Sequence, residues 1–223
     1  MSVSRLTEKL RQILCLRRIH PHTGEACPEA DCSVLRGAPV LLPQYSFPCY
    51  GFYPYGGSVK KRIHAMKFDF ARWIANELGD EMCSVVSAVD FDMITWVPLH
   101  YTRIMVRGYN PSQYIARRIA RFSGKPLARL LVRTRRTKPQ SSLKGEDRLA
   151  NPVGAFSPVR KADIRGKHIL LTDDVVTLGA TLDECMKVLY NMGAASVTAV
   201  VYTFGGVRPF PRRDTESERQ QSV

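Results

Sequence analysis

Apolar residues at helical spacing predict helices in several parts of the chain. Between residues 59 and 78 they recur at every third or fourth position, the period of an amphipathic helix, and the segment Lys67–Asp69 predicts a break between two helices. Residues 3–14 show the same spacing over a shorter stretch. Asn110 is a good N-cap and Pro111 suits the first helical turn, so a further helix is expected to begin there.

Short runs of apolar residues predict buried strands. We expect strands at residues 92–98, 127–132, 153–156, 168–172 and 196–203. A helix expected over residues 179–191 joins the last two, and a strand–helix–strand unit of this kind is right-handed with parallel strands. The fold class is therefore α/β. The turn at residues 173–181 then follows the carboxyl end of a strand, where open α/β sheets bind ligands.

Composition divides the 223 residues into three parts. Residues 1–50 are irregular, rich in proline and hold four of the six cysteines, which indicates a small separate module. Residues 51–204 form the main domain, and its first segment, residues 51–57, is rich in glycine and tyrosine and is expected to be a turn. Residues 205–223 are expected to be a flexible basic and polar tail.

Positive charge gathers in the middle of the chain. The formal net charge is +13, and residues 101–150 hold thirteen Lys or Arg against two acidic residues. Such a block attracts phosphates, pyrophosphate or nucleic acid, and a solvated basic surface is the alternative. Apolar runs are too short for a membrane span, and the first ten residues lack the apolar core of a signal peptide. We therefore expect a cytoplasmic protein without membrane insertion.

The segment between the strand at 168–172 and the next helix carries the strongest chemical signal. A helix N-terminus offers free N–H groups to a phosphate, and here Gly179 lies between the hydroxyls of Thr177 and Thr181. Asp173 and Asp174, which we expect to leave the strand, can accept hydrogen bonds from a diol or help to hold a divalent cation. Together these groups suit a ribose 5-phosphate, and an ordinary capping turn is the alternative.

The stretch Ile169–Thr181 resembles the phosphoribosyl pyrophosphate (PRPP) binding motif of type I phosphoribosyltransferases. Further matches, in order along the chain, resemble the ComF family of competence protein F and its gluconate-utilisation relatives. They are Tyr55–Lys67, Val97–His100, Arg107–Asn110, Gln113, Gln140, Leu143, Arg148, Asn151, Gly154–Phe156 and Gly193–Ala194. The resemblance covers about residues 50–204. It implies the type I phosphoribosyltransferase fold, a mainly parallel five-stranded sheet flanked by helices.

The resemblance also implies roles for individual residues. The ribose hydroxyls would meet Asp173 and Asp174. The 5-phosphate would lie on Thr177, Leu178, Gly179, Ala180 and Thr181. Pyrophosphate, carried with Mg²⁺, would face Leu99, His100, Arg103 and Arg107. No residue stands out as the general base, because His64 and His100 qualify by residue type alone. Residues 134–151 would be either a lid over the substrate or an ordinary loop.

Three residues depart from the usual pattern of that family. Leu178 stands where a second threonine is usual, which removes a hydroxyl donor worth roughly 1.5–3 kcal/mol to a charged acceptor. Thr172 replaces an aliphatic residue, and Pro111 replaces a glutamine. These changes are compatible with phosphate binding, but they favour a protein that binds the ligand without turning it over.

The cysteines make a weak case for a metal. ComF-type proteins often begin with paired Cys-x-x-Cys zinc motifs, but here Arg18 takes the place of the second cysteine after Cys15, and four residues separate Cys27 from Cys32. We therefore expect unligated thiols, Cys49 among them, in preference to zinc.

Two functions fit the sequence. The first is an enzyme that transfers the phosphoribosyl group of Mg²⁺-bound PRPP to an acceptor and releases pyrophosphate, mainly by positioning and electrostatics. The alternative is a non-catalytic ComF-type protein of DNA uptake that binds single-stranded DNA or DNA-processing proteins. Both would recognise a phosphoribosyl ligand, and the sequence leaves the oligomeric state open, with a dimer among the options.

Overall fold

The computed structural model describes residues 39–43, 45–69, 71–135, 150–159 and 162–205. Several of the expected features lie outside these residues. They are the helix at 3–14, Cys15, Cys27 and Cys32, most of the loop at 134–151, and the tail after residue 205.

Five strands form the central sheet. Their bounds are β1 Val40–Leu41, β2 Cys49–Pro54, β3 Met93–Trp96, β6 His168–Val176 and β7 Ser196–Phe204. Their order across the sheet is β1-β2-β7-β6-β3, with β2, β7, β6 and β3 parallel and β1 antiparallel at one edge. This arrangement confirms the predicted α/β class and the mainly parallel five-stranded sheet.

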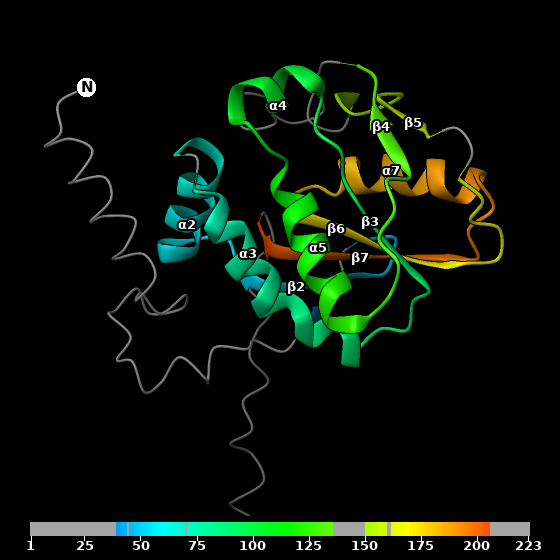
Figure 1. Cartoon of the computed structure of the whole chain (residues 1–223), viewed down its shortest axis with the longest axis horizontal. Coiled ribbons are helices and arrows are strands. Elements are labelled where there is room, and N and C mark those ends of the chain that lie inside the picture. The colour runs from blue at the N-terminus through cyan, green and yellow to red at the C-terminus, as the bar shows by residue number, and fades with distance from the viewer. Residues whose placement is uncertain (1–38, 44, 70, 136–149, 160–161, 206–223) are drawn as a thin grey trace, which may run out of the picture.

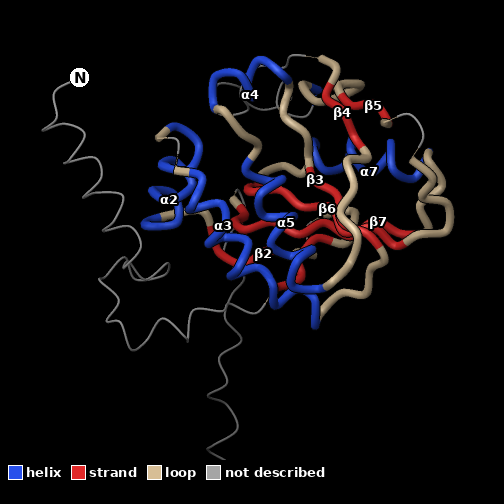
Figure 2. The backbone as a smooth tube through the Cα atoms, in the orientation of Figure 1, coloured by secondary structure: helices blue, strands red, loops and turns tan. Residues whose placement is uncertain are grey.

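Helices connect the strands and cover the sheet (Figures 1 and 2). They are α2 Gly57–Phe68, α3 Arg72–Glu81, the 3₁₀ helix η2 Met82–Ser87, α4 Tyr101–Arg107, α5 Pro111–Ser123 and α7 Ala180–Asn191. The break between α2 and α3 falls where the sequence predicts it. Asn110 caps α5, because its Oδ1 accepts a hydrogen bond from Ser112 N at 3.1 Å. Of the described helices, none is both long enough and apolar enough to span a membrane.

The two faces of the sheet carry separate hydrophobic cores. One core packs α2, α3 and α5 against Leu170 and Tyr202, and the other packs α7 against Leu171 and Val201. Figure 1 shows α5 crossing in front of the sheet. Neighbouring residues of β6 therefore face opposite sides, as the period of two in a strand requires.

The segment at residues 51–57 is not the expected turn. Residues 49–54 form β2, which pairs in parallel with β7, so the expected module boundary after residue 50 falls inside a strand. The glycine that indicated a turn serves close packing instead: a Cβ on Gly51 would lie 2.4 Å from the ring of Phe204. A pattern of glycines and aromatic residues cannot distinguish these two uses of glycine.

A two-stranded antiparallel sheet lies outside the central sheet. Its strands, β4 (Leu131–Arg133) and β5 (Phe156–Pro158), are antiparallel and begin three or four residues later than the predicted strands at 127–132 and 153–156. Leu127 instead forms an isolated bridge with Ile94 of β3. Before β5, Gly154 adopts a φ of +65°, which ends any extended run at that residue.

Candidate functional site

The candidate site lies at the carboxyl ends of β3 and β6. Contrary to our expectation, Asp173 and Asp174 do not leave the strand, because β6 continues to Val176 through its pairing with β7. On the other side, β3 ends at Trp96, and Val97 N donates the last hydrogen bond, to Thr172 O at 3.0 Å. The aspartates therefore lie where β6 has passed the end of β3, next to the start of α5 and the end of α2.

Asp173 is bonded to the N-terminus of α5. Its Oδ1 accepts hydrogen bonds from Ser112 Oγ and from Asp174 N, both at 2.8 Å. Burial and, to a smaller extent, the charge of Asp174 raise the pKa of Asp173 to about 7, while the hydrogen bond from Ser112 and the charge of Lys67 act in the opposite direction. The surroundings of this carboxyl group therefore favour its protonated form.

Asp174 forms an ion pair with α2. Its Oδ1 lies 2.9 Å from Nζ of Lys67, and the two side chains are 9 % and 23 % exposed. The end of α2 is held by two further contacts: Tyr109 donates a hydrogen bond from its hydroxyl to the carbonyl of Met66, and the Arg107 guanidinium lies 5.7 Å from the centre of the Phe68 ring. Lys67 is part of the matched stretch Tyr55–Lys67, but that motif does not predict its ion pair with Asp174.

Two side chains fix the position of α5 against the sheet. Thr172 is fully buried and donates from Oγ1 to the carbonyl of Ser112 at 3.1 Å, with the carbonyl of Thr95 at 3.3 Å. Asn110 donates from Nδ2 to the carbonyl of Val97 at 3.0 Å. Thr172, which departs from the family's aliphatic residue, thus has a structural reason: it ties the residue that bonds Asp173 to the strand that carries Asp173.

The turn into α7 contains a glycine in the left-handed conformation, and an aromatic pair lies against it. Gly179 has a φ of +80° and precedes Ala180, the first residue of the helix. Tyr45 donates a hydrogen bond to the carbonyl of Thr177 at 2.6 Å and stacks on Phe47 with ring centroids 5.6 Å apart. A Cβ on Gly179 would lie 2.8 Å from the Tyr45 ring, so both backbone and space require glycine here.

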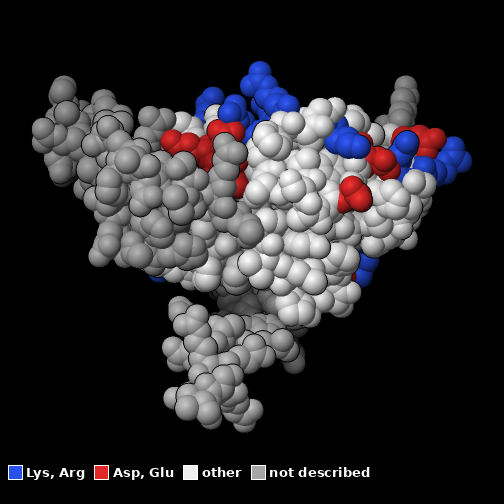
Figure 3. Space-filling view, turned by 90° about the horizontal axis from the view of Figure 1, so that it is seen from below, with Lys and Arg blue, Asp and Glu red and all other residues white. Residues whose placement is uncertain are grey.

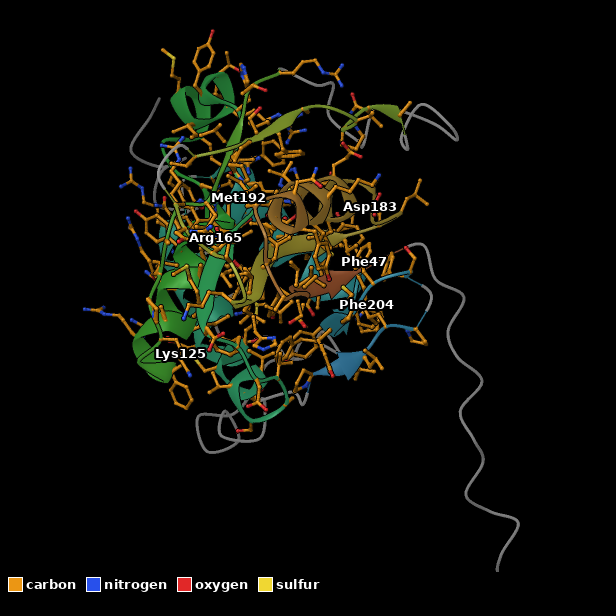
Figure 4. All side chains as sticks on the ribbon, turned by 90° about the vertical axis from the view of Figure 1, so that its right-hand side faces the viewer. Phe47, Lys125, Arg165, Asp183, Met192 and Phe204 are labelled. Atoms are coloured by element: carbon orange, nitrogen blue, oxygen red, sulfur yellow. The ribbon has the colours of Figure 1, made fainter. Side chains whose placement is uncertain are left out.

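A shallow depression of about 390 Å³ lies beside this turn. Tyr45, Phe47, Leu178, Gly179 and Ala180 line one part of it. Leu178 is 45 % exposed, so its apolar side chain lies at the surface where the family's hydroxyl would be. Figure 4 shows Phe47 and Asp183 on the same side of the molecule, next to this turn.

The residues expected to face pyrophosphate lie at and just before α4. His100 is buried and caps this helix, since its Nδ1 accepts a hydrogen bond from Thr102 N at 3.4 Å and lies 2.9 Å from Thr102 Oγ1. Leu99 precedes it and is half-buried. Arg103 lies near Arg133 of β4, whose pKa falls to about 10 because of burial and, to a smaller extent, the charge of Arg103. Arg107 reaches the end of α2, as described above.

The donor set suits Mg²⁺ better than a protein-bound metal. No group of three or more His, Cys, Asp or Glu side chains occurs among the described residues at a spacing that could hold an ion. Two adjacent carboxylates are nevertheless available, and Mg²⁺ is commonly held by one or two carboxylates together with substrate phosphates. The residues present therefore fit Mg²⁺ that arrives with a phosphorylated ligand.

The described cysteines are buried thiols. Burial and, to a smaller extent, the nearby charge of Asp173 raise the pKa of Cys49 to about 12, so the thiol is protonated at neutral pH. The same two causes raise the pKa of Cys185 in α7. The zinc hypothesis rests mainly on Cys15, Cys27 and Cys32, which lie outside the described residues.

Four residues next to the site were not predicted from the sequence. They are Tyr45, Lys67, Ser112 and Arg133. Ser112 could have been found, because it lies two residues after a recognisable N-cap and so had to be close to the strand ends. The other three come from segments whose approach to β6 depends on tertiary packing, and their sequence neighbourhoods carry no signal of it.

The chain is similar to known proteins in sequence and in structure. The sequence model of the phosphoribosyl transferase domain matches residues 104–221, just over half of the chain. Among solved structures, glutamine PRPP amidotransferase from B. subtilis, complexed with ADP and GMP, aligns with 63 % of this chain and 30 % of its own, at 21 % identity and a TM-score of 0.43.

Curated relatives include competence protein F of Haemophilus influenzae, 34 % identical over 103 residues, or 45 % of either chain. DNA utilization protein YhgH of Salmonella typhi is 34 % identical over 60 % of this chain and 62 % of its own. Competence protein ComFC of Bacillus subtilis is 28 % identical over 83 % and 80 %. The chain spans about half the length of the first of these relatives. The chain belongs to the phosphoribosyl transferase domain family and, within it, to the ComF family.

Proposed function

We propose that the protein binds PRPP or a related ribose 5-phosphate ligand at the end of β6 and, with Mg²⁺, transfers the phosphoribosyl group. The observation that carries the proposal is the order of groups there. Two carboxylates, Asp173 and Asp174, come six and five residues before Gly179, whose left-handed conformation precedes α7. A diol acceptor and an anion-binding helix N-terminus are thus adjacent.

Each part of the ligand has a matching group. The backbone N–H groups at the start of α7 would hold the 5-phosphate, so the loss of a hydroxyl at Leu178 leaves the main donors in place. The aspartates would accept hydrogen bonds from the ribose hydroxyls. Arg103 and Arg107 of α4 would offset the charge of pyrophosphate.

Transfer would break the bond between C1 of the ribose and the pyrophosphate oxygen. Pyrophosphate leaves with the bonding electrons, and an electron pair of the acceptor forms the new bond to C1. Bound Mg²⁺ supplies charge neutralisation of the leaving pyrophosphate. The protein contributes positioning and preorganised charge, which supply most of the rate in reactions of this kind.

Calorimetric titration with PRPP and with nucleoside monophosphates, with and without Mg²⁺, tests the proposal. We expect PRPP to bind more tightly with Mg²⁺, and the double variant Asp173→Asn, Asp174→Asn to bind at least about tenfold more weakly, since each hydrogen bond to a charged group is worth about 1.5–3 kcal/mol. Asp163→Asn, at an exposed ion pair with Arg165, is the control. Tight binding by the double variant would show that the ligand lies elsewhere.

A basic groove supports nucleic-acid binding as a second candidate function. It has a volume of about 460 Å³ on α5 and its flanks, lined by Asn76, Tyr114, Arg117, Arg118, Ala120, Arg121, Lys125 and Leu127. Arg118 is paired with Asp80 at 2.6 Å, and Arg121 and Lys125 are exposed. Lys125 lies on the side away from Phe47 and Asp183 (Figure 4), so this groove is separate from the turn into α7.

Charge is unevenly placed on the surface as well. Figure 3 shows Lys and Arg together with Asp and Glu along the upper margin of one face, while the middle of that face is mostly uncharged. A localised basic groove attracts a phosphate backbone without reading bases. Two relatives carry names that refer to competence or to DNA utilization, which is consistent with this candidate.

Single-stranded DNA binding at a series of salt concentrations tests the groove. We expect the slope of log affinity against log salt to fall by about 0.7 for each phosphate contact removed, so that the double variant Arg121→Ala, Lys125→Ala loses about 1.4. Lys60→Ala with Lys61→Ala, which removes two exposed lysines of α2, is the matched control. Equal slopes for the two double variants would remove the groove from consideration.

A further inference from the structure

Lys67 carries a charge that the proposed function has not used. It lies in the last turn of α2, and its Nζ is 2.9 Å from Asp174 Oδ1. An ammonium group has three N–H donors, and among the described residues Asp174 is its hydrogen-bond acceptor. The side chain of Lys67 is 23 % exposed, so its remaining N–H donors can reach a ligand that lies next to Asp174.

The position of Lys67 is fixed from both sides. The carbonyl of Met66, just before it, accepts the hydrogen bond from Tyr109, and the ring of Phe68, just after it, lies under the guanidinium of Arg107. Both partners belong to the stretch from α4 to α5, which holds the residues expected to face pyrophosphate. The ammonium group is thus held where the aspartate pair and that stretch meet.

The positive charge of Lys67 can offset the repulsion between the two aspartates and a negatively charged ligand. Two adjacent carboxylates repel a polyanion, and a ligand with pyrophosphate on C1 brings more negative charge close to them than ribose 5-phosphate does. The 5-phosphate has the helix N-terminus of α7 as its own positive partner. The group on C1 needs cations of its own. Arg103 and Arg107 would supply two from α4, and Lys67 is the lysine in contact with the aspartate pair.

We propose that Lys67 is a specificity-determining residue: it neutralises Asp174 in the free protein and donates to the pyrophosphate on C1 in the loaded site. The proposal rests on the proposed function and deepens it, because it predicts which ribose 5-phosphate ligands the site prefers. A lysine that merely oriented Asp174 would affect all ligands with a ribose diol equally.

The test compares two ligands on four proteins by calorimetry in the presence of Mg²⁺. We expect Lys67→Met to weaken PRPP binding about tenfold or more, as for one hydrogen bond to a charged group, and ribose 5-phosphate binding less than about threefold. Lys67→Arg should recover most of the PRPP affinity because it restores the charge. Lys61→Met, an exposed lysine on the same helix, should bind both ligands like the wild type. Circular dichroism melting curves check that each variant is folded.

The outcomes separate the two proposals. Equal losses for both ligands, or no loss for either, would overturn the role of Lys67 and leave the proposed function standing. If Lys67→Met did not fold, the Lys67→Arg variant would decide whether the charge of Lys67 sets the ligand preference. A Lys67→Arg protein that folded but no longer preferred PRPP to ribose 5-phosphate would contradict a charge-based role. If the wild type bound neither ligand, the proposed function would fall, and this inference with it.

Discussion

Asp173 and Asp174 are neighbours in the chain, yet they meet different surroundings. Asp173 accepts a hydrogen bond from the neutral hydroxyl of Ser112, and burial raises its pKa to about 7. Asp174 faces the ammonium group of Lys67. Asp173 thus has a neutral partner on α5 and Asp174 a charged partner on α2, although both helices lie on the same face of the sheet. The comparison teaches that the two aspartates of this motif are not interchangeable.

The two sides also differ in how they are supported. On the α2 side, the buried Arg62 donates to Glu81 at 2.7 Å and to the Tyr202 hydroxyl at 2.6 Å, and Tyr202 donates to Glu81 at 2.8 Å. On the α5 side, neutral hydrogen bonds from Thr172 and Asn110 hold the helix. A charged network supports the charged partner, and a neutral one supports the neutral partner, so each side can be weakened separately.

The largest expected effect comes from Arg62→Met on the α2 side. The change removes a buried guanidinium and leaves Glu81 without its cation, and breaking a buried ion pair in this way costs about 3–5 kcal/mol. Because Glu81 is 20 % exposed, we expect the lower end, about 3 kcal/mol, in the free energy of unfolding from urea titration. A loss below about 1 kcal/mol would mean that the network contributes little to holding α2.

A matched control separates charge from position. Lys61 is exposed on the same helix, and Lys61→Met should change the free energy of unfolding by less than about 0.5 kcal/mol. Arg62→Met should also weaken PRPP binding, because Lys67 lies five residues further along the same helix. If stability fell while PRPP affinity stayed unchanged, α2 would not be the element that positions Lys67.

On the α5 side, Asp173→Asn should change how stability depends on pH. The pKa of Asp173 is about 7 in the folded protein and about 3.9 when unfolded, so the folded state binds the proton more tightly. This contribution to stability is complete below about pH 4 and is lost as pH rises through 7. Asn does not titrate, so the variant should not lose this contribution. The free energy of unfolding of the variant minus that of the wild type should therefore rise by about 1 kcal/mol or more from pH 5 to pH 8.

Urea unfolding midpoints at pH 5, 6, 7 and 8 measure this difference. Asp163→Asn is the control, since its exposed carboxyl group has a pKa lowered by the hydrogen bond from Arg165 and is ionised throughout this range. Parallel curves for the wild type and Asp173→Asn would show that Asp173 is ionised across the range, and the contrast between the two aspartates would disappear.

Much of the fold could be predicted because its signals are local. The N-cap at Asn110 and the apolar period before and after residues 67–69 fix helix boundaries within a few residues. The unit from β6 through α7 to β7 follows from two apolar runs and one amphipathic helix. β2 could not be predicted, because it forms by pairing with the distant strand β7, and the close approach of the Phe204 ring that requires Gly51 also depends on that pairing.

The site divides in the same way. The order of Asp173, Asp174 and Gly179 is a local motif, so it could be found in the sequence. The length of β6 could not, because it depends on β7 pairing beyond the end of β3. The ion pair between Lys67 and Asp174 joins residues 107 positions apart, and neither of the two motifs that contain them indicates the other as its partner.

The smallest effect is expected from Thr172→Val, which tests the support of the α5 side. Valine has nearly the same shape and suits a strand, but it removes the hydroxyl that bonds the carbonyl of Ser112. Loss of a buried hydrogen bond costs about 1 kcal/mol, or roughly 2–4 °C in the melting temperature of a chain of this size. Thr198→Val in β7, where the side chain is half-exposed, is the matched control. If Thr172→Val were instead more stable than the wild type, the hydroxyl would not hold α5, and the aliphatic residue usual in the family would be the better fit at this position.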